Sequence, residues 1–459
     1  MISTYKDKWN KLLSSQTFRN RSQSIDTDGR NPFENDYGRL ISSAPIRRLQ
    51  DKTQVFPLEK SDFIRTRLTH SLEVSYIASS IGQSIEKFLL EKKEIDPEQR
   101  GFLSSLLRTS GLIHDLGNPP FGHFGEEAVK KFFIDYFKEN SDINLTDLEK
   151  SDFENFDGNV QTFRILSKLY YFGDEFGYNL TFSALASIIK YPSNSLEGNE
   201  KPPTEIAKKK FGYFVSETDS YKQINEYLEL SNKRSPIVYL LEAADDIAYS
   251  AADIEDGIKL GIITIDEIYN LFEENLTNNK TVVIDKLDQL KKQYCKDASI
   301  DSMLIVQKFR IFTQQLMIQG VINAFKDNYD KIMKGELQNE IIDISSASDI
   351  RKSYKKLQYI VFDNESIVKK EIAGWEAIYG LLKIFVKASQ SKNFTENGGN
   401  NYESRLFKII SASYRKVYKN IETYPNSEYK KLQLIVDFIS GMTDSYAIDL
   451  YQELKGIKL

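Results

Sequence analysis

The sequence predicts an all-α protein, and three observations support this prediction. Apolar residues recur every three or four positions over residues 74–88, which is the pattern of one buried helix face. The same period returns over residues 305–316. Alternating strand-like segments bounded by tight turns are scarce, which argues against a sheet-based fold or a barrel. The periodic positions are Val74, Ile77, Ile81, Ile85 and Phe88 in the first segment, and Ile305, Phe309, Phe312 and Leu316 in the second.

The length and composition indicate a globular protein of more than one domain. The chain has 459 residues, of which 41% are hydrophobic and 28% are charged, and this excludes a disordered or collagen-like chain. At roughly 150 residues per domain, it could hold about three domains. Its 61 basic and 66 acidic residues give a formal charge of −5, which disfavours a protein that coats nucleic acid in bulk.

Several features favour a cytoplasmic protein without a membrane segment. No run approaches the ~18 consecutive apolar residues that a membrane helix needs. The first residues, MISTYKDKWNKLL, do not form the apolar stretch of a signal peptide. The single cysteine, Cys295, cannot form an internal disulfide and suits a reducing compartment. One cysteine also excludes a cysteine-rich zinc site.

A polar, loop-rich stretch interrupts the helical pattern at residues 140–232, and YPSNSLEGNEKPP from Tyr191 is a clear example of it. We interpret this stretch as an insertion between core helices. The chain shows no internal repeat. It also has no segment of the GxxxxGK type, which excludes a P-loop nucleotide site at the level of motif.

All three histidines of the chain, His70, His114 and His123, lie within 54 residues of one another. His114 follows the helical pattern of GFLSSLLRTSGLIHD and shares its apolar face, while Asp115 is turned by about 100° from it. An adjacent histidine and aspartate at the end of a buried helix can reach one cation from two sides. A single pair of this kind is a weak signal, so its value depends on further ligands.

His70 and Asp245 are two further candidate ligands. His70 stands at the start of a helix with an inward apolar face, in RTRLTHSLEVSYIASSIG. Asp245 stands on the small and apolar face of the helix around YLLEAADDIAYSAADIEDG, whereas Asp246 is expected on a more polar face. A carboxylate on a buried face must be paired or bound to a metal. A buried salt bridge of Asp245 with Arg65 or Arg67 is therefore the alternative.

Together these candidates offer two nitrogen and two oxygen ligands from three helices. The four residues are His70, His114, Asp115 and Asp245. This mixed set suits a divalent transition ion better than an all-oxygen magnesium site. With open coordination positions, such an ion would lower the pKa of a bound water and orient an anionic oxygen.

The chain resembles the bacterial deoxyguanosine triphosphate triphosphohydrolases (dGTPases) of the HD-domain superfamily over nearly its whole length. An ordered series of segments carries this resemblance, which makes it far more specific than one His–Asp pair. The segments are RRLQDKTQVFPLE from Arg47, RTRLTHSLEVS from Arg65, GLIHDLGNPPFGHFGEEA from Gly111, KYP from Lys190, KKFGYFVSE from Lys209, EAADDIAYSAADIEDG from Glu242 and DFISGMTDSYA from Asp437.

The resemblance implies an HD-domain helical core with a polar insertion and additional C-terminal helices. We expect residues 1–270 to form the catalytic core, with the insertion at about 140–232. Residues 271–459 would form a helical region that completes the substrate pocket and makes oligomer contacts. The resemblance also implies one divalent metal ion per subunit (Mn, Mg, Co, Ni, Fe and Zn are not distinguished), held by His70, His114, Asp115 and Asp245.

The reaction implied by the resemblance is metal-dependent hydrolysis of dGTP to deoxyguanosine and intact triphosphate, by attack at the α-phosphorus. His123 and Glu126 are the implied catalytic pair. Their spacing agrees with this role, because a carboxylate three residues along a helix can bond one imidazole nitrogen and raise the basicity of the other. Whether His123 activates water as a base or protonates the 5′ oxygen as an acid stays open, and a purely structural histidine is the alternative.

The resemblance further implies contacts with the substrate. Tyr249 and Asp253 lie four and eight residues after Asp245 and form one row with it. Tyr249 would crowd a ribose 2′-hydroxyl, and Asp253 would lie near the 3′-hydroxyl. Gln54 and Val55 match residues that contact the deoxyribose and its neighbourhood. The matches to phosphate-side contacts, where a triphosphate requires cations, are Arg67, Lys190 and Tyr191.

One departure from the family concerns guanine. Related enzymes carry an arginine ahead of the DYISGMTD-like element that is implicated in guanine recognition. The corresponding stretch here, EYKKLQLIVDFISGMTD, has Lys430, Lys431 and Gln433 instead. Broad-specificity hydrolysis of deoxynucleoside triphosphates is therefore an alternative to a preference for dGTP.

Two further functions compete with triphosphate release from a deoxynucleotide. One is that of a different HD phosphohydrolase, such as a nucleotidase or phosphodiesterase, and the other is that of a non-enzymatic nucleotide- or DNA-binding regulator. The GMTD element and the overall spacing resemble those of the dGTP-preferring, hexameric branch of the family, and this resemblance implies a homo-oligomer, with a hexamer favoured. The lysines at 208–210 offer a basic run for a single-stranded DNA effector, although such a run is also typical of a solvated face.

Overall fold

The protein is built almost entirely from helices. Its structure is a computed structural model that describes residues 5–19, 29–59, 61–170, 173–294, 298–420 and 426–457. Cys295 lies outside these residues. Within them, the β contact is limited to one isolated antiparallel bridge between Thr53 and Thr66, so the all-α prediction is confirmed. In the same part of the chain, no helix combines the length and the apolar character needed to cross a membrane.

The helices follow one another through the whole described chain. The α-helices are α1 (Lys6–Leu12), α2 (Pro32–Ile41), α3 (Ala44–Arg48), α4 (Arg67–Lys92), α5 (Phe102–Ile113), α6 (Gly122–Glu139), α7 (Asp147–Glu154), α8 (Gly158–Arg164), α9 (Phe182–Ile188), α10 (Thr218–Tyr227), α11 (Pro236–Lys259), α12 (Ile265–Asn275), α13 (Lys280–Tyr294), α14 (Ala298–Asp327), α15 (Tyr329–Met333), α16 (Ser348–Phe362), α17 (Glu365–Ser389), α18 (Tyr402–Ile409), α19 (Ala412–Asn420), α20 (Ser427–Ser440) and α21 (Asp444–Leu454). The two periodic segments predicted from the sequence lie in α4 and α14.

Local side-chain chemistry fixes where α4 begins and ends. Thr66 is its N-cap, and the Thr66 and Thr69 side chains each accept a hydrogen bond from the other residue's backbone N–H. The helix ends at Lys93, which adopts a left-handed conformation with φ of 61°. These caps place His70 one turn after the N-cap, where its backbone N–H bonds the carbonyl of Thr66.

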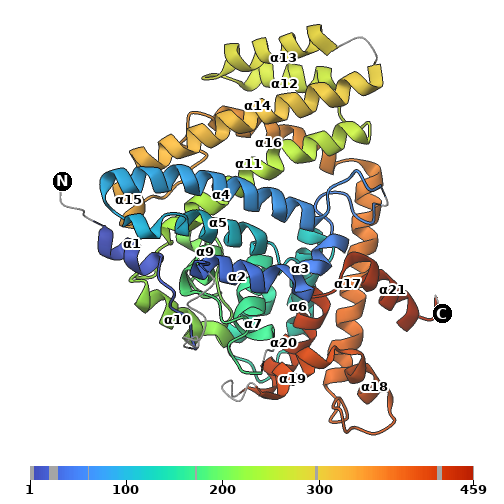
Figure 1. Ribbon diagram of the computed structural model, residues 1–459. Helices are drawn as coiled ribbons and strands as arrows, with labels where there is room; N and C mark the ends of the chain where they lie inside the picture. The colour runs from blue at the N-terminus through green and yellow to red at the C-terminus, as the bar shows by residue number, and fades with distance from the viewer. Residues whose placement is uncertain are drawn as a thin grey trace.

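The centre of the molecule is formed by α4, α5 and α11 (Figure 1). The helices α4 and α5 are antiparallel and approach each other closely, because Gly82 and Gly111 face the partner backbone. A Cβ atom on Gly111 would lie 2.6 Å from the Cα of Ser75, and one on Gly82 would lie 2.8 Å from the Cα of Ser104. This crossing brings the first turns of α4 next to the C-terminal end of α5.

The remaining helices surround this centre. The helix α11 packs against α4 and α5 and also against α14 and α16, and the layer of α12, α13 and α14 lies beyond it at the top of Figure 1. The helix α17 runs along one side of the molecule and packs against α6, α20 and α21. The second half of the chain therefore contacts both α11 and α6, which carry predicted site residues.

Residues 140–232 contain the short helices α7 to α10 and long irregular connections. The helix α9 packs against α5 and α11, and Phe156, Phe163, Phe211 and Phe214 are fully buried. This polar stretch of the sequence thus contributes its own apolar residues to the central core.

Gly111 should not tolerate a side chain, because its Cβ position is occupied by the backbone of α4. We expect Gly111→Ala to separate α4 from α5 and to lower the free energy of unfolding by about 1–3 kcal/mol. Urea denaturation followed by circular dichroism measures the change. Gly38→Ala in α2 is the matched control, because its Cβ would only meet Arg30 at 3.7 Å. A change to alanine there should be neutral or slightly stabilising, and equal losses in both variants would contradict this account of the crossing.

Candidate active site

Three core helices bring the predicted metal ligands together. His70 comes from the start of α4, His114 and Asp115 from the turn directly after α5, and Asp245 from the middle of α11. The Oδ1 atom of Asp245 lies 3.1 Å from Nε2 of His70 and 3.4 Å from Nε2 of His114. His114 Nε2 also lies 3.5 Å from Oδ1 of Asp115. One ligand atom each from His70, His114 and Asp115 fits within 4.8 Å of the others.

The backbone sets the orientation of the His114 ring. Its Nδ1 lies 2.8 Å from the carbonyl oxygen of Gly111 and donates a hydrogen bond to it, which leaves Nε2 as the nitrogen that can bind a metal. Among the described residues, His114 Nε2 is a buried atom without a hydrogen-bond partner, although two carboxylates lie nearby. A buried ring nitrogen without a partner beside two carboxylates is a position for positive charge, which a bound divalent cation would supply.

The charges at this site favour a bound cation. Burial raises the pKa of Asp115, but His114 and Arg67 outweigh that effect and lower it to about 2. Burial also raises the pKa of Asp245. His114, His70 and Lys190 outweigh this effect and hold the pKa of the carboxyl well below its usual range. Both carboxylates are therefore ionised at neutral pH.

Asp115 is held by two side chains from different parts of the chain. Its Oδ2 atom forms an ion pair with Nη1 of Arg67, and its Oδ1 accepts a hydrogen bond of 2.8 Å from Nδ2 of Asn118. Arg67 also donates from Nε to the carbonyl oxygen of Thr53. Sequence reasoning did not single out Asn118, although it stands in the segment GNPPFGH that carried part of the resemblance.

The polar face of α11 that carries Asp246 is buried. Asp246 is only 6% exposed, and its Oδ1 accepts hydrogen bonds from Nη2 of Arg351 at 3.0 Å and from the hydroxyl of Tyr249. The reason is that α16 packs on this face of α11, and the sequence of α11 alone cannot reveal that cover. Burial raises the pKa of Asp246 to about 6, against the opposing charge of Arg351.

The alternative salt bridge of Asp245 with Arg65 or Arg67 is also absent from the described residues. Arg67 pairs with Asp115 instead. Arg65 pairs with three other carboxylates, those of Glu73, Glu255 and Asp256. The Asp245 side chain, which is 20% exposed, faces the two histidines and Lys190.

His123 and Glu126 meet at the start of α6. His123 Nδ1 lies 3.2 Å from Oε2 of Glu126, and the other oxygen, Oε1, accepts a hydrogen bond of 2.7 Å from the backbone N–H of Gly158. Glu126 is buried, whereas the His123 side chain is 77% exposed. The hydrogen bond that His123 donates to Glu126 raises the pKa of His123 above its ordinary value. A fixed carboxylate thus orients an accessible imidazole.

Two cations border the candidate metal ligands. Lys190 follows α9, and its Nζ lies 3.9 Å from Oδ2 of Asp245; Arg67 contacts Asp115 as described. Arg234 donates from Nε to the carbonyl oxygen of Lys190 and forms an ion pair with Glu242 of α11. Arg234 therefore fixes the position of Lys190 relative to α11. The neighbouring Tyr191 is buried, with 7% exposure.

The residues matched to the sugar are distributed over two segments. Val55 is buried, and Oε1 of Gln54 is a buried acceptor without a partner among the described residues. Tyr249 donates its hydroxyl to Asp246. Asp253 is also buried, which raises its pKa to about 7. Two residues of α16, Arg351 and Gln358, donate hydrogen bonds to Asp246 and Asp253. Neither was predicted from the sequence.

Comparison of the sequence with known proteins identifies its family. A family model of the HD domain matches residues 67–224, and a model of the phosphohydrolase-associated domain matches residues 385–453. Relatives in Listeria innocua and Listeria monocytogenes, each named deoxyguanosinetriphosphate triphosphohydrolase-like protein, are 41% identical to the chain over 98% of its length and their whole length. The chain belongs to this family of HD-domain phosphohydrolases. A relative of the same name in Synechocystis is 30% identical over 98% of the chain and its own whole length.

The HD-domain match covers only part of the candidate site of this phosphohydrolase. His70, His114, Asp115 and the pair of His123 with Glu126 lie inside the matched residues. Asp245 lies beyond them in the chain, and its inclusion depends on its distances to both histidines. The resemblance to the family is thus confirmed, and the candidate ligand set of this HD-domain protein extends into α11.

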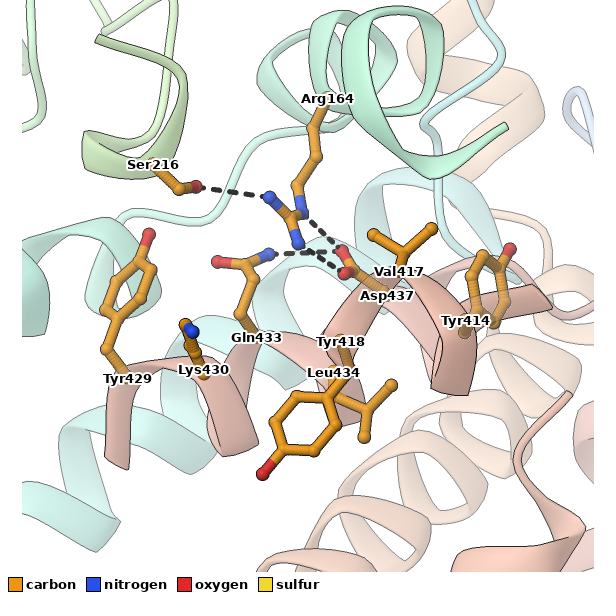
Figure 2. A pocket seen from close by; sticks show the side chains of 10 residues that line it. All are labelled: Arg164, Ser216, Tyr414, Val417, Tyr418, Tyr429, Lys430, Gln433, Leu434 and Asp437. Atoms are coloured by element: carbon orange, nitrogen blue, oxygen red, sulfur yellow. Dashed lines mark hydrogen bonds and ion pairs between the residues drawn. The ribbon is translucent and has the colours of Figure 1, made fainter. Parts of the chain in front are cut away.

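The stretch in which this family member lacks an arginine lies in α20. Figure 2 shows Gln433 and Lys430 at a narrow pocket lined also by tyrosines. Gln433 is buried and donates from Nε2 to Oδ1 of Asp437. Arg164 donates to both oxygens of the same carboxylate, from Nε to Oδ1 and from Nη2 to Oδ2. Gln433 is therefore part of a buried polar network. The pocket's tyrosines are Tyr414, Tyr418 and Tyr429.

The basic run at 208–210 is neutralised locally. Each lysine forms an ion pair with a different carboxylate. The partners of Lys208, Lys209 and Lys210 are, in that order, Glu200, Glu340 and Asp157. Such paired lysines present less free positive charge than the sequence suggests.

The two adjacent aspartates of α11 should differ in their effect on metal binding. We expect Asp245→Ala to weaken Mn²⁺ binding by about a hundredfold or more, because it removes a carboxylate that faces both histidines. Asp246→Ala should retain Mn²⁺, since its carboxylate faces α16. Isothermal titration calorimetry and metal content after gel filtration measure both variants, with circular dichroism as the folding control. Loss of metal in Asp246→Ala alone would shift the ligand assignment by one residue.

Proposed function

We propose that this protein hydrolyses dGTP to deoxyguanosine and intact triphosphate, with a divalent metal ion held by His70, His114, Asp115 and Asp245. The observation that carries the proposal is the convergence of buried histidine nitrogens and ionised carboxylates beside two cations. The names of the family relatives support dGTP as the substrate. When bound, the metal would act as a Lewis acid towards a phosphate oxygen and a water molecule.

The side chains supply the remaining requirements of the reaction. Attack of water on the α-phosphorus breaks the bond to the 5′ oxygen, so one proton leaves the water and one reaches the departing oxygen. His123 is proposed to transfer one of these protons, and Glu126 holds its ring through Nδ1. Arg67 and Lys190 are proposed to bind the anionic triphosphate, because their charges flank the ligand carboxylates.

The sugar is proposed to lie against the segment of residues 54–55 and the row of α11 that contains Tyr249 and Asp253. The free buried acceptor of Gln54 supports this placement, because it lacks a partner in the described protein. The ring of Tyr249 would exclude a 2′-hydroxyl, and Asp253 would accept a hydrogen bond from the 3′-hydroxyl. Tyr191, next to Lys190, completes the proposed phosphate side.

Broad-specificity hydrolysis of deoxynucleoside triphosphates is the second candidate function. It is favoured by the residues of α20, where the arginine of related enzymes is replaced by Lys430, Lys431 and Gln433, and where Gln433 is engaged by Asp437.

The division into residues 1–270 and 271–459, a homo-oligomer and a cytoplasmic location also stay predictions.

Product analysis tests the proposed function. The purified protein is incubated with Mn²⁺ and with each deoxynucleoside triphosphate or GTP separately, and the products are resolved by chromatography. We expect deoxyguanosine and intact triphosphate, mainly from dGTP. Equal rates on all four deoxynucleotides would favour the second candidate. Release of orthophosphate or of a nucleoside monophosphate would contradict the proposed reaction.

The pair of His123 and Glu126 should control the pH dependence of turnover. We expect His123→Ala to lower kcat by about 10²–10⁴-fold while metal binding is retained. In Glu126→Gln, loss of the carboxylate should lower the pKa of His123, because Glu126 raises it in the native protein. The His123-dependent limb of the pH–kcat profile should therefore move to lower pH.

Whether kcat rises or falls with pH along the His123-dependent limb shows whether His123 acts as a base or as an acid. If His123 acts as a base, activity rises with pH through its pKa, and Glu126→Gln becomes active at lower pH. If His123 acts as an acid, activity falls above its pKa, and Glu126→Gln loses activity at lower pH than the native enzyme. An unchanged profile would show that Glu126 does not tune His123.

A further inference from the structure

The helices α11 and α16 are joined by two hydrogen-bonded pairs with the same spacing. Arg351 Nη2 donates to Oδ1 of Asp246 at 3.0 Å, and Gln358 Nε2 donates to Oδ2 of Asp253 at 2.8 Å. The two aspartates are seven residues apart on α11, and their partners are seven residues apart on α16. The helices therefore run parallel at this contact, in a fixed register of two turns. All four residues are less than a tenth exposed.

Tyr249 is tied into the first of these pairs. Its hydroxyl donates to Oδ1 of Asp246, which is the oxygen that also accepts from Arg351. Arg351 is itself fixed by ion pairs of 3.3 Å with Glu340 and 3.1 Å with Asp343. The orientation of the Tyr249 side chain thus depends on a guanidinium that comes from another helix, more than one hundred residues along the chain.

We propose that Arg351 and Gln358 are positioning residues through which α16 sets the choice of sugar. Arg351 acts on Tyr249 through Asp246, and Gln358 acts directly on Asp253. This inference rests on the proposed function, in which Tyr249 and Asp253 face the deoxyribose. Neither α16 residue needs to touch the substrate in this account.

The physical basis is the rigidity that steric selection requires. A tyrosine ring rejects a hydroxyl group only if the ring cannot move aside, and a displacement of about 1 Å is enough to change discrimination strongly. The hydroxyl of Tyr249 would be free to move if Asp246 lacked its cationic partner and rotated towards water. A buried carboxylate without a donor would also be destabilised. Arg351 therefore keeps both Asp246 and the ring in place.

A double-mutant cycle tests the role of Arg351. The ratio of kcat/KM for dGTP to kcat/KM for GTP is measured in the native enzyme, Arg351→Met, Tyr249→Phe and the double variant. We expect Arg351→Met to lower this ratio by about tenfold, the scale of one hydrogen bond to a charged group. In the Tyr249→Phe background, the same change should have no further effect, because the hydroxyl that Asp246 holds is gone.

Controls separate positioning from general damage. Arg351→Lys keeps the charge without the planar fork, so it should restore part of the ratio. Lys355→Met on the exposed side of α16 should leave the ratio unchanged. Thermal midpoints and Mn²⁺ content identify variants that fail to fold. Gln358→Leu should selectively reduce the preference for dGTP over the analogue that lacks the 3′-hydroxyl.

Two results would overturn the inference about Arg351. One is an equal loss of kcat/KM for dGTP and GTP, which would place Arg351 in stability or in a contact common to both nucleotides. The other is a fall of the ratio in Tyr249→Phe as large as in the native background. For Gln358, an unchanged preference over the 3′-deoxy analogue would overturn its assigned role.

A binding measurement keeps this test independent of the proposed reaction. The dissociation constants of dGTP and GTP are measured by calorimetry in His123→Ala, with and without Arg351→Met. If the native protein releases no triphosphate, the proposed function fails while the ratio of dissociation constants still reports on Arg351. If the protein releases triphosphate but the ratio is insensitive to Arg351, the inference alone fails.

Discussion

The close crossing of α4 and α5 is the constraint on which the rest of the structure depends. Glycine at position 111 lets the two backbones approach until a single methyl group would overlap Ser75. That approach puts the first turns of one helix beside the last turn of the other, so His70 and His114 face each other with ring centroids 5.3 Å apart. The helix α11 then packs across both and adds Asp245.

The site that results is an electrostatic balance between buried charges of opposite sign. Two ionised carboxylates would repel each other in a low-dielectric interior, and the nearby imidazoles, Arg67 and Lys190 offset that repulsion. The same arrangement leaves room for positive charge at the histidine nitrogens and for negative charge beside the two cations. A metal ion and a polyphosphate are groups with this complementary pair of charges.

Much of this arrangement could be predicted from the sequence, because it depends on local periodicity. The helical class and the inward direction of His70 and His114 follow from apolar residues spaced by three and four. The bonding of His123 to Glu126 follows from their separation by three residues. The environment of Asp246 could not be predicted in this way. Its burial depends on α16, about one hundred residues further on, and no pattern within α11 encodes which helix covers it.

The hydrogen bond between Glu126 and the backbone of Gly158 restricts which residue can stand at position 158. A Cβ atom at position 158 would overlap Oδ1 of Asn118 and would lie 2.9 Å from Oε1 of Glu126. Gly158 thus lies close to Asn118, whose amide bonds Asp115, and its backbone N–H bonds the carboxylate that contacts His123. A substitution at position 158 would therefore be felt at both Asp115 and His123, although neither residue is its neighbour in the chain.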